Sequence, residues 1–428
     1  MAVTTAADSD PGADLDAAVR AEGLRMSFQP IVSLPGSEIV GYEALARWPR
    51  AGLPDPVSVF AHAARTQRLD SLDQACITAA VNAAFEIGLP RGSMLAVNCE
   101  PASRYVPQDG GPLSRAAAEY VMVVELTERG LLSDPAALLC KVEQLRCDGF
   151  AVALDDVGAH ADSLALLDIV EPDVIKLDFN LIHGQTHRHQ SQTLAAVLAY
   201  HERTGAVIVA EGIESELHLE RAVAVGAALG QGFRFGRPHT PGIEDLATVA
   251  PRVALLPDRT VPRPVARPAD SPFDRAAREP GVSVRTARKE TLTAFSRHIE
   301  RQAADTVDPA MIFAAVQDSK NLSTSTLRRY ETLARTAPLT AILGRGVPAV
   351  PAPGVRGVQL DATDPLCLEW TVVTLGPRTA SALIARERPP RGPVREDDRL
   401  FDFVLTFDRS LVAAVGGLLL GRIHAAGA

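Results

Sequence analysis

The sequence has few cysteines, and their arrangement argues against a disulfide framework and against a structural zinc site. Five cysteines occur among 428 residues, at Cys76, Cys99, Cys140, Cys147 and Cys367. They are odd in number, scattered along the chain, and form no C-x-x-C pair. A disulfide framework or a structural zinc site requires closely spaced or paired cysteines, so neither is indicated.

The sequence also shows no basic-then-apolar start, no membrane-length apolar run and no excess of positive charge, so we expect no signal peptide. Met1–Asp16 is small, polar and acidic, without the basic-then-apolar order of a signal peptide. The longest late apolar run, Leu411–Gly421, is too short to span a bilayer. The net charge is -9, and no basic patch stands out in the first half. We therefore expect a cytoplasmic protein without a membrane anchor and without a direct nucleic-acid partner.

The first half alternates short apolar strands with helix-like stretches. Hydrophobic residues make up 46% and charged residues 22% of the chain, which is ordinary for a globular protein. The expected strands are Phe28–Val32, Ile39–Leu45, Met94–Asn98, Val121–Leu126, Ala151–Asp156, Val174–Leu177, Val207–Ala210 and Ala228–Gly232. Alternation of this kind favours parallel β/α units. Eight strands over roughly 230 residues fit a (β/α)8 barrel, so the predicted fold class is α/β.

Composition divides the chain into four parts. We expect a disordered tail over residues 1–17, the barrel over 18–250, a linker rich in proline and arginine over 251–282, and a smaller C-terminal α/β domain over 283–428. Seven prolines fall between Pro251 and Pro280, where no apolar period is visible. The last domain should contain a helix at Lys289–Ala304, strands at Gly357–Leu360, Trp370–Leu375, Ala380–Ala385 and Phe401–Phe407, and a helix at Ser410–His424.

Polar side chains stand at the ends of seven successive barrel strands. In order they are Glu43, Asn98, Glu125, Asp155 with Asp156, Lys176, Glu211 and Gln231. The carboxyl ends of barrel strands open onto one face, where chemistry is built. Converging carboxylates would shift each other's pKa values unless cations neutralise them, and oxygen ligands suit magnesium or manganese rather than zinc. Two such ions a few ångströms apart are an arrangement that hydrolyses phosphoesters.

Ordered motifs over about residues 18–245 resemble the EAL domain family of cyclic di-GMP phosphodiesterases, which have a modified barrel fold. The motifs are F-Q-P-I-V (Phe28–Val32), G-Y-E-A-L-A-R-W (Gly41–Trp48), V-N-C (Val97–Cys99), E-L-T-E (Glu125–Glu128), D-D-V-G (Asp155–Gly158), I-K-L-D (Ile175–Asp178), A-E-G-I-E (Ala210–Glu214) and Q-G-F-R-F-G-R-P (Gln231–Pro238). Several ordered motifs at suitable spacing are far more specific than one alone.

The resemblance implies roles for twelve residues of these motifs. It implies metal ligands at Glu43, Asn98, Glu125, Asp155 and Asp156, catalytic groups at Lys176, Glu211 and Glu128, and substrate-binding residues at Arg47, Leu45, Gln231 and Asp178. Glu128 would brace the loop after the fifth strand. Asp178 could alternatively be a helix cap. The resemblance further implies two Mg²⁺ or Mn²⁺ ions, inhibition by Ca²⁺, cyclic di-GMP as substrate, linear pGpG as product, and a homodimer formed through the barrel.

The loop after the fifth strand departs from the family pattern D-D-F-G-x-G-x-S-S. Here it reads D-D-V-G-A-H-A-D-S over Asp155–Ser163, so the aromatic residue, the second glycine and one serine are missing. The intact ligand set favours a metal-dependent phosphodiesterase. A cyclic di-GMP-binding effector or protein-interaction module without turnover is the alternative, and an unrelated barrel phosphoesterase is a third hypothesis.

The C-terminal domain resembles, more weakly, the DICT sensory domains. The resemblance rests on F-A-A-V-Q (Phe313–Gln317), R-R-Y-E-T-L-A (Arg328–Ala334) and F-D-F-V-L-T-F-D (Phe401–Asp408). No catalytic constellation occurs there, so the resemblance implies a regulatory role for this domain.

Overall fold

The chain forms two compact units. The computed structural model describes residues 11–49, 55–107, 110–127, 130–159, 162–184, 188–250, 256, 271–305, 310–389 and 395–424. The first unit, called here the barrel unit, comprises Met1–Leu131, Lys141–Ala159 and Pro172–Asp258. The second unit comprises Leu132–Cys140, His160–Glu171 and Arg259–Ala428. Among the described residues, no helix combines the length and the apolarity needed to cross a bilayer.

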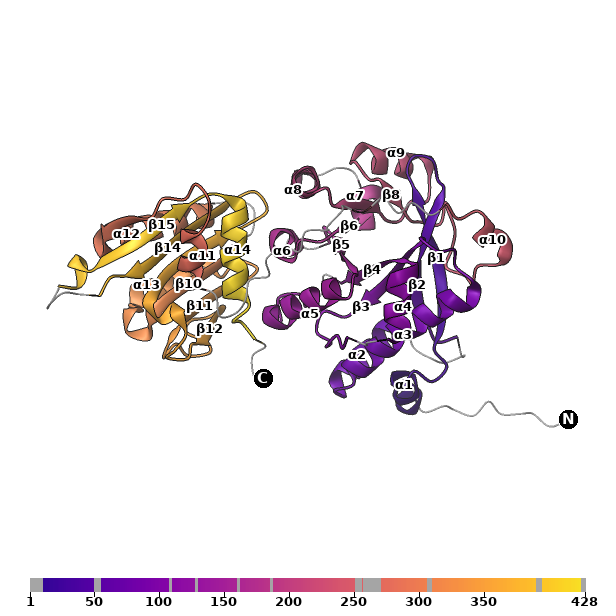
Figure 1. The fold of residues 1–428 in the computed structure, drawn as a ribbon, viewed down its shortest axis with the longest axis horizontal. Coiled ribbons are helices and arrows are strands. Elements are labelled where there is room, and N and C mark those ends of the chain that lie inside the picture. Colours follow the sequence, from indigo (N-terminus) through magenta and orange to yellow (C-terminus); the bar gives the residue numbers. More distant parts are fainter. Residues whose placement is uncertain are drawn as a thin grey trace. The chain divides into compact units, whose positions relative to one another are not determined.

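Eight strands and their intervening helices build the first part of the chain (Figure 1). In chain order the elements are α1 (Pro11–Val19), β1 (Arg25–Ser33), β2 (Ile39–Arg47), α2 (Pro56–Arg65), α3 (Leu69–Ile87), β3 (Met94–Cys99), α4 (Pro112–Glu119), β4 (Val121–Leu126), α5 (Pro135–Cys147), β5 (Ala151–Val157), α6 (Asp162–Val170), β6 (Val174–Leu177), α7 (Phe179–His183), α8 (Arg188–Thr204), β7 (Val207–Ala210), α9 (Glu216–Ala224), β8 (Leu229–Gly230) and α10 (Ile243–Ala247).

The strands close into a barrel in the order β1 to β8, which confirms the predicted fold class. One expectation is wrong: β1 is antiparallel to both of its neighbours, β2 and β8, so not every strand belongs to a parallel β/α unit. A short turn joins β1 to β2, with the Ser33 amide donating to the Glu38 carbonyl. Such a turn reverses the chain, whereas a parallel pair needs a long crossover.

The barrel interior is filled by apolar side chains from every strand, most of them small or branched. They are Ile31, Val40, Met94, Ala96, Val123, Ala153, Val174, Val207, Val209 and Leu229, all buried. Successive side chains of a strand point alternately into the barrel and out toward the helices. Because both sides are buried, the strands are nearly continuous apolar runs. At Gly41 a Cβ atom would lie 2.0 Å from the Met94 carbonyl oxygen, so only glycine lets β2 approach β3 so closely.

Helix α1 occupies part of the stretch that composition predicts to be a disordered tail. Ala18 and Val19 are buried with Trp48, Val59 and Leu72 in a cluster outside the barrel. The tail prediction is therefore wrong for residues 11–17, and the preceding ten residues lie outside the described part of the chain.

The second unit is built on one seven-stranded sheet, drawn in orange to yellow in Figure 1. Its further elements are α11 (Pro272–Ala277), β9 (Arg285–Arg288), α12 (Lys289–Asp305), β10 (Met311–Asp318), α13 (Thr324–Leu333), β11 (Thr340–Arg345), β12 (Val355–Gln359), β13 (Glu369–Leu375), β14 (Ala380–Glu387), β15 (Leu400–Thr406) and α14 (Arg409–Leu420). The strand order is β12-β11-β10-β13-β14-β15-β9, and only β10, β11 and β12 pair in parallel.

Both faces of this sheet are covered. Leu292 and Ile299 of α12 pack on Val372 and Phe401, and Tyr330 and Leu333 of α13 pack beside them on the same face. Residues alternating with Val372 on β13 face the other way, toward α14. The predicted helices and the strands β12 to β15 are therefore present, whereas β9, β10 and β11 were not expected as strands.

A buried glutamate attaches helix α11 to the sheet of the second unit. Glu369 on β13 is 0% exposed and accepts hydrogen bonds from the Ser271 hydroxyl, the Phe273 amide and Arg386. Arg386 also donates to Asp274 at 2.9 Å. Helix α11 is thereby attached to the sheet, so the predicted linker does not extend through Ser271–Ala277. The residues 251–255 and 257–270 of that linker lie outside the described part of the chain.

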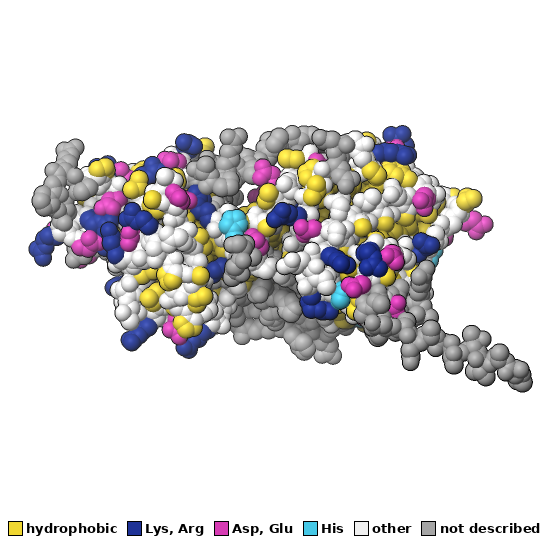
Figure 2. All heavy atoms as spheres, turned by 90° about the horizontal axis from the view of Figure 1, so that it is seen from below, with side chains coloured by type: hydrophobic (Ala, Val, Ile, Leu, Met, Phe, Trp, Pro, Cys, Tyr) yellow, Lys and Arg dark blue, Asp and Glu magenta, His cyan; other side chains and the backbone are white. Residues whose placement is uncertain are grey.

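Charged side chains of opposite sign are interspersed on the face shown in Figure 2. Within the second unit, Arg288 pairs with Asp398 and Lys289 pairs with Glu396, and the acid of each pair is substantially exposed. Exposed pairs of this kind contribute little to stability because solvent screens them.

Replacing Glu369 with alanine should destabilise the second unit by about 3 kcal/mol, because Ser271, Phe273 and Arg386 lose a buried charged acceptor. The matched control is Glu396→Ala, an exposed acid that should cost less than about 1 kcal/mol. Chemical denaturation of the full chain, followed by circular dichroism, measures both changes. Equal stability of the two variants would contradict the anchoring role of Glu369.

Candidate functional site

A buried lysine lies at the centre of the candidate site. Lys176 on β6 is 2% exposed. Its Nζ lies 2.7 Å from Glu211, 2.9 Å from Glu125, 3.0 Å from Asp155 and 3.5 Å from Glu43. These acids belong to β2, β4, β5 and the residue that follows β7, so only closure of the barrel brings them together. The structure thus brings four of the predicted strand-end acids around one ammonium group.

Two amides complete the arrangement around Glu43. Asn98 Nδ2 on β3 donates to Glu43 Oε1 at 2.8 Å. Gln231 Nε2, directly after β8, donates to Glu43 Oε2 at 3.0 Å. The amide oxygen of Gln231 is buried and has no hydrogen-bond partner among the described residues. It therefore remains available as a ligand oxygen.

A backbone irregularity directs the two adjacent aspartates. Neighbouring residues of a regular strand point to opposite faces, so Asp155 and Asp156 could not share one site on an unbroken strand. The β5–β6 register shifts between Leu154 and Val157, and Asp156 has a φ of 53°. Such a bulge re-aims a side chain next to a functional site.

The turn that follows this bulge requires glycine. Gly158 has a φ of 108°, and a Cβ atom there would lie 2.6 Å from Leu181 Cδ1. The chain can therefore leave β5 in this direction only without a side chain at this position.

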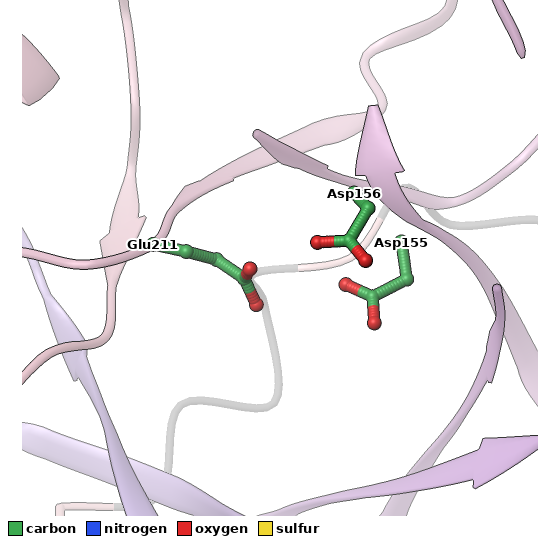
Figure 3. Close-up of side chains that lie close together, drawn as sticks. All are labelled: Asp155, Asp156 and Glu211. Atoms are coloured by element: carbon green, nitrogen blue, oxygen red, sulfur yellow. The ribbon is translucent and has the colours of Figure 1, made fainter. Parts of the chain in front are cut away.

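The carboxylates of Asp155, Asp156 and Glu211 form a cluster that could hold a cation. One oxygen from each lies within 4.8 Å of the others. In Figure 3 the Asp155 and Asp156 carboxylates, both from β5, point toward that of Glu211. Asp155 is buried, whereas Asp156 is exposed and Glu211 is partly exposed, so the cluster can be reached from solvent. Three oxygen donors of this kind suit a hard cation such as magnesium or manganese.

The electrostatics indicate more negative charge than Lys176 neutralises. Burial, and then the charge of Glu43, raises the pKa of Glu125 well above its usual value, although Lys176 opposes the shift. Burial likewise raises the pKa of Glu211 to about 8. Burial would lower the pKa of Lys176, but Asp155, Glu125 and Glu211 together raise it well above its usual value. A divalent cation would relieve this excess charge, so the residues fit a metal site.

The pKa of Glu43 shifts in the opposite direction from those of Glu125 and Glu211. Burial would raise the pKa of this carboxyl, but the Lys176 ammonium and hydrogen bonds from Gln231 and Asn98 outweigh it and hold the pKa below its usual value. Glu43 therefore stays ionised as a ligand and as a counter-charge for Lys176.

The residues expected to bind substrate have different surroundings. Leu45 and Arg47 follow Glu43 at every second position of β2, so the three side chains are on the same face of the strand. Arg47 also lines an open hollow with Trp48, Asp55 and Pro238. Asp178 is buried and caps α7, accepting a hydrogen bond from the Asn180 amide at 2.9 Å. This supports the capping alternative, while its substrate role stays a prediction. Glu128 lies outside the described residues, as do His160 and Ala161 of the loop after β5.

Sequence reasoning missed a second polar cluster behind the site. Asp73 on α3, Ser103 after β3 and Lys141 on α5 are each 3% exposed. The available signal was a lone aspartate on an apolar helix face, between Leu72 and Cys76. A single acid in that position does not indicate its partners.

The family comparison agrees with this geometry. The model of the EAL domain matches residues 13–238, which is more than half of the chain. The chain belongs to the EAL domain family. A second model, the sensory domain in diguanylate cyclases and two-component systems, called DICT, matches residues 275–388. The EAL match covers all of the described strand-end residues that surround Lys176.

Several curated relatives share the EAL domain. The cyclic di-GMP phosphodiesterase RocR of Pseudomonas aeruginosa is 32% identical over 231 residues, which cover 49% of this chain and 56% of RocR. The bifunctional diguanylate cyclase/cyclic di-GMP phosphodiesterase MucR of the same organism is 28% identical, over 55% of this chain and 36% of MucR. The chain therefore spans about half or less of the length of these relatives.

Solved structures also resemble the EAL part. The manganese/cy-diGMP complex of BlrP1 from Klebsiella pneumoniae at pH 9.0 is 29% identical, with a TM-score of 0.44, and covers 51% of this chain and 56% of that chain.

Manganese at about 100 times its Kd should stabilise the barrel unit by about 2.7 kcal/mol, because it binds the folded carboxylate cluster and not the unfolded chain. For a unit of this size the melting temperature should rise by about 5–10 °C. Asp156→Asn should abolish the rise, whereas Glu22→Gln, an exposed acid away from the cluster, should keep it. Scanning calorimetry in manganese and in chelator measures the effect. Identical melting in both solutions would show that the cluster holds no cation.

Proposed function

We propose that the barrel unit hydrolyses cyclic di-GMP to linear pGpG with the help of Mg²⁺ or Mn²⁺. The observation that carries the proposal is the buried Lys176 ammonium within 3.5 Å of four carboxylates, beside the Asp155–Asp156–Glu211 cluster. Membership of the EAL family and the phosphodiesterase names of relatives such as RocR support the choice of substrate.

The proposed ligands are Glu43, Asn98, Glu125, Asp155 and Asp156, which would together hold two cations. Bound divalent cations would lower the pKa of a water molecule and polarise a phosphoryl oxygen. Hydrogen bonds from Asn98 and Gln231 fix both oxygens of Glu43, so this ligand is oriented before any cation arrives.

Lys176 and Glu211 are the proposed catalytic side chains. The four surrounding acids keep Lys176 charged, so it can stabilise the negative charge that develops on the phosphoryl group. Glu211 hydrogen bonds this ammonium and lies at the open side of the cluster, where it can orient the attacking water. Glu128 would brace the loop after β5.

Arg47, Leu45, Gln231 and Asp178 are the proposed substrate-binding residues. Arg47 offers a planar fork for phosphate oxygens from the hollow that it lines with Trp48 and Pro238. Two further proposals follow from the family match: the DICT domain regulates turnover, and the barrel forms a homodimer. Light scattering of the purified protein tests the second.

A binding module without turnover is the second candidate. The observation that favours it is Val157, which is buried where the family pattern has an aromatic residue after the two aspartates. A changed loop could weaken the hold of Asp156 on a cation and leave binding without cleavage.

Hydrolysis should require a divalent cation. Purified protein with cyclic di-GMP should produce pGpG in magnesium or manganese and none in chelator. Calcium accepts looser geometry than magnesium, so it should support binding of cyclic di-GMP but block turnover. Chromatography of the products and calorimetric binding in calcium distinguish the two candidates. Binding without product in every cation would favour the binding module, and equal turnover in chelator would refute a cation-dependent reaction.

Lys176→Ala should lower turnover by roughly 10²–10³, the range for losing one electrostatic stabiliser of the transition state. Binding of cyclic di-GMP in calcium should change much less. Lys176→Arg should not restore turnover, because a planar fork does not fit the place of a compact ammonium between four acids.

The control for these variants is Arg115→Ala, which removes an exposed cation that pairs with Glu119 on α4, outside the family motifs. It should keep near-normal turnover under the same conditions. Near-normal turnover of Lys176→Ala would refute the catalytic assignment.

A further inference from the structure

A buried polar network lies behind the end of β3, on the segment that follows Asn98. Asp73 Oδ1 accepts the Glu100 amide at 3.1 Å. Its Oδ2 accepts the Ser103 hydroxyl at 2.5 Å and the Cys99 thiol at 3.3 Å. The Asp73 carboxylate of α3 therefore accepts hydrogen bonds from three residues of the turn that runs from Cys99 to Ser103.

Lys141 of α5 holds the same turn from another direction. Its Nζ donates to the Glu100 carbonyl at 2.5 Å and to Ser103 Oγ at 2.9 Å. A hydroxyl donates one hydrogen bond and accepts two, so Ser103 links the lysine to the aspartate. The positive and the negative charge thus meet through a hydroxyl, inside a region where each side chain is 3% exposed.

Burying two charged side chains costs free energy unless hydrogen bonds and opposite charges compensate for the lost hydration. We therefore ask which part of the backbone this network holds in place. Among the described residues, the side-chain hydrogen bonds of Asp73 and Lys141 all end on Cys99, Glu100 or Ser103. The residue that precedes this turn is Asn98, whose amide orients Glu43 at 2.8 Å. Asp73 and Lys141 therefore fix the backbone next to Asn98, the residue whose amide hydrogen bonds Glu43.

We propose that Asp73, Ser103 and Lys141 are positioning residues that hold Asn98 in place for the divalent cation. The inference rests on the proposed function, because it takes Asn98 as a ligand. In the described part of the chain, the network's hydrogen bonds reach neither the cation cluster nor the substrate-binding residues, so we expect its effect to pass through Asn98.

The test is titration calorimetry of the full chain with manganese chloride and no substrate. Asp73→Asn keeps the size of the side chain but removes its charge, and it should raise the manganese Kd about tenfold or more, as loss of an outer hydrogen-bond partner does. Asn98→Ala should raise the Kd by itself. In the Asn98→Ala background, Asp73→Asn should add less than about twofold, because residues that act through one another are not additive.

The matched control is Asp173→Asn. Asp173 is 5% exposed and accepts the Val152 amide at 2.8 Å, but it precedes β6 and so lies at the opposite end of the strands. It should leave the manganese Kd unchanged. An equal loss of affinity in Asp173→Asn, or full additivity of Asp73→Asn with Asn98→Ala, would overturn the inference and show a general effect on the fold.

A second variant covers the case in which Asp73→Asn does not fold. Ser103→Ala removes only the hydroxyl that joins Lys141 to Asp73 and should also weaken manganese binding. Wild-type affinity in this variant would overturn the inference. Wild-type protein that binds manganese but hydrolyses no cyclic di-GMP refutes the proposed function and leaves the inference standing, whereas absence of manganese binding refutes both.

Discussion

The site depends on one interaction, the burial of the Lys176 ammonium among Glu43, Glu125, Asp155 and Glu211. None of these charges could be buried alone, because each would lose its hydration without compensation. Their mutual attraction exists only when the strands that carry them lie side by side in a closed sheet. Fold and site are therefore linked: closure of the barrel creates the cluster, and the cluster constrains how the strand ends meet.

Local irregularities follow from this constraint. Asp156 adopts a positive φ at the bulge of β5, a conformation that costs free energy for a residue with a side chain. The gain is a second carboxylate directed toward Glu211, which an unbroken strand would have pointed away. Gly158 then allows the chain to turn past Leu181. Strain at this position serves the arrangement of charges rather than the stability of the barrel.

The sequence predicts the barrel strands and the lysine cluster because both follow from periodic rules. Apolar runs give the strands, and polar residues at their carboxyl ends must meet at one rim. The direction of β1 depends on a short turn and on pairing with β8, which no local pattern shows. The edge strand β9 has an exposed R-T-A-R sequence without an apolar period. Helix α11 could have been predicted, since Ser271 and Pro272 form an N-cap followed by proline at the first helical position.

The balance of buried charge distinguishes networks that hold the fold together from the cluster that forms the candidate site. Glu369 is matched by Arg386 and by two further donors, and Asp73 shares its turn with Lys141 through Ser103. These networks are satisfied within the protein and fix backbone segments. The lysine cluster is different, because its carboxylates outnumber its single cation and burial leaves the pKa values of Glu125 and Glu211 raised. A cluster with more buried negative than positive charge, at a point that solvent can reach, is arranged to receive positive charge from outside.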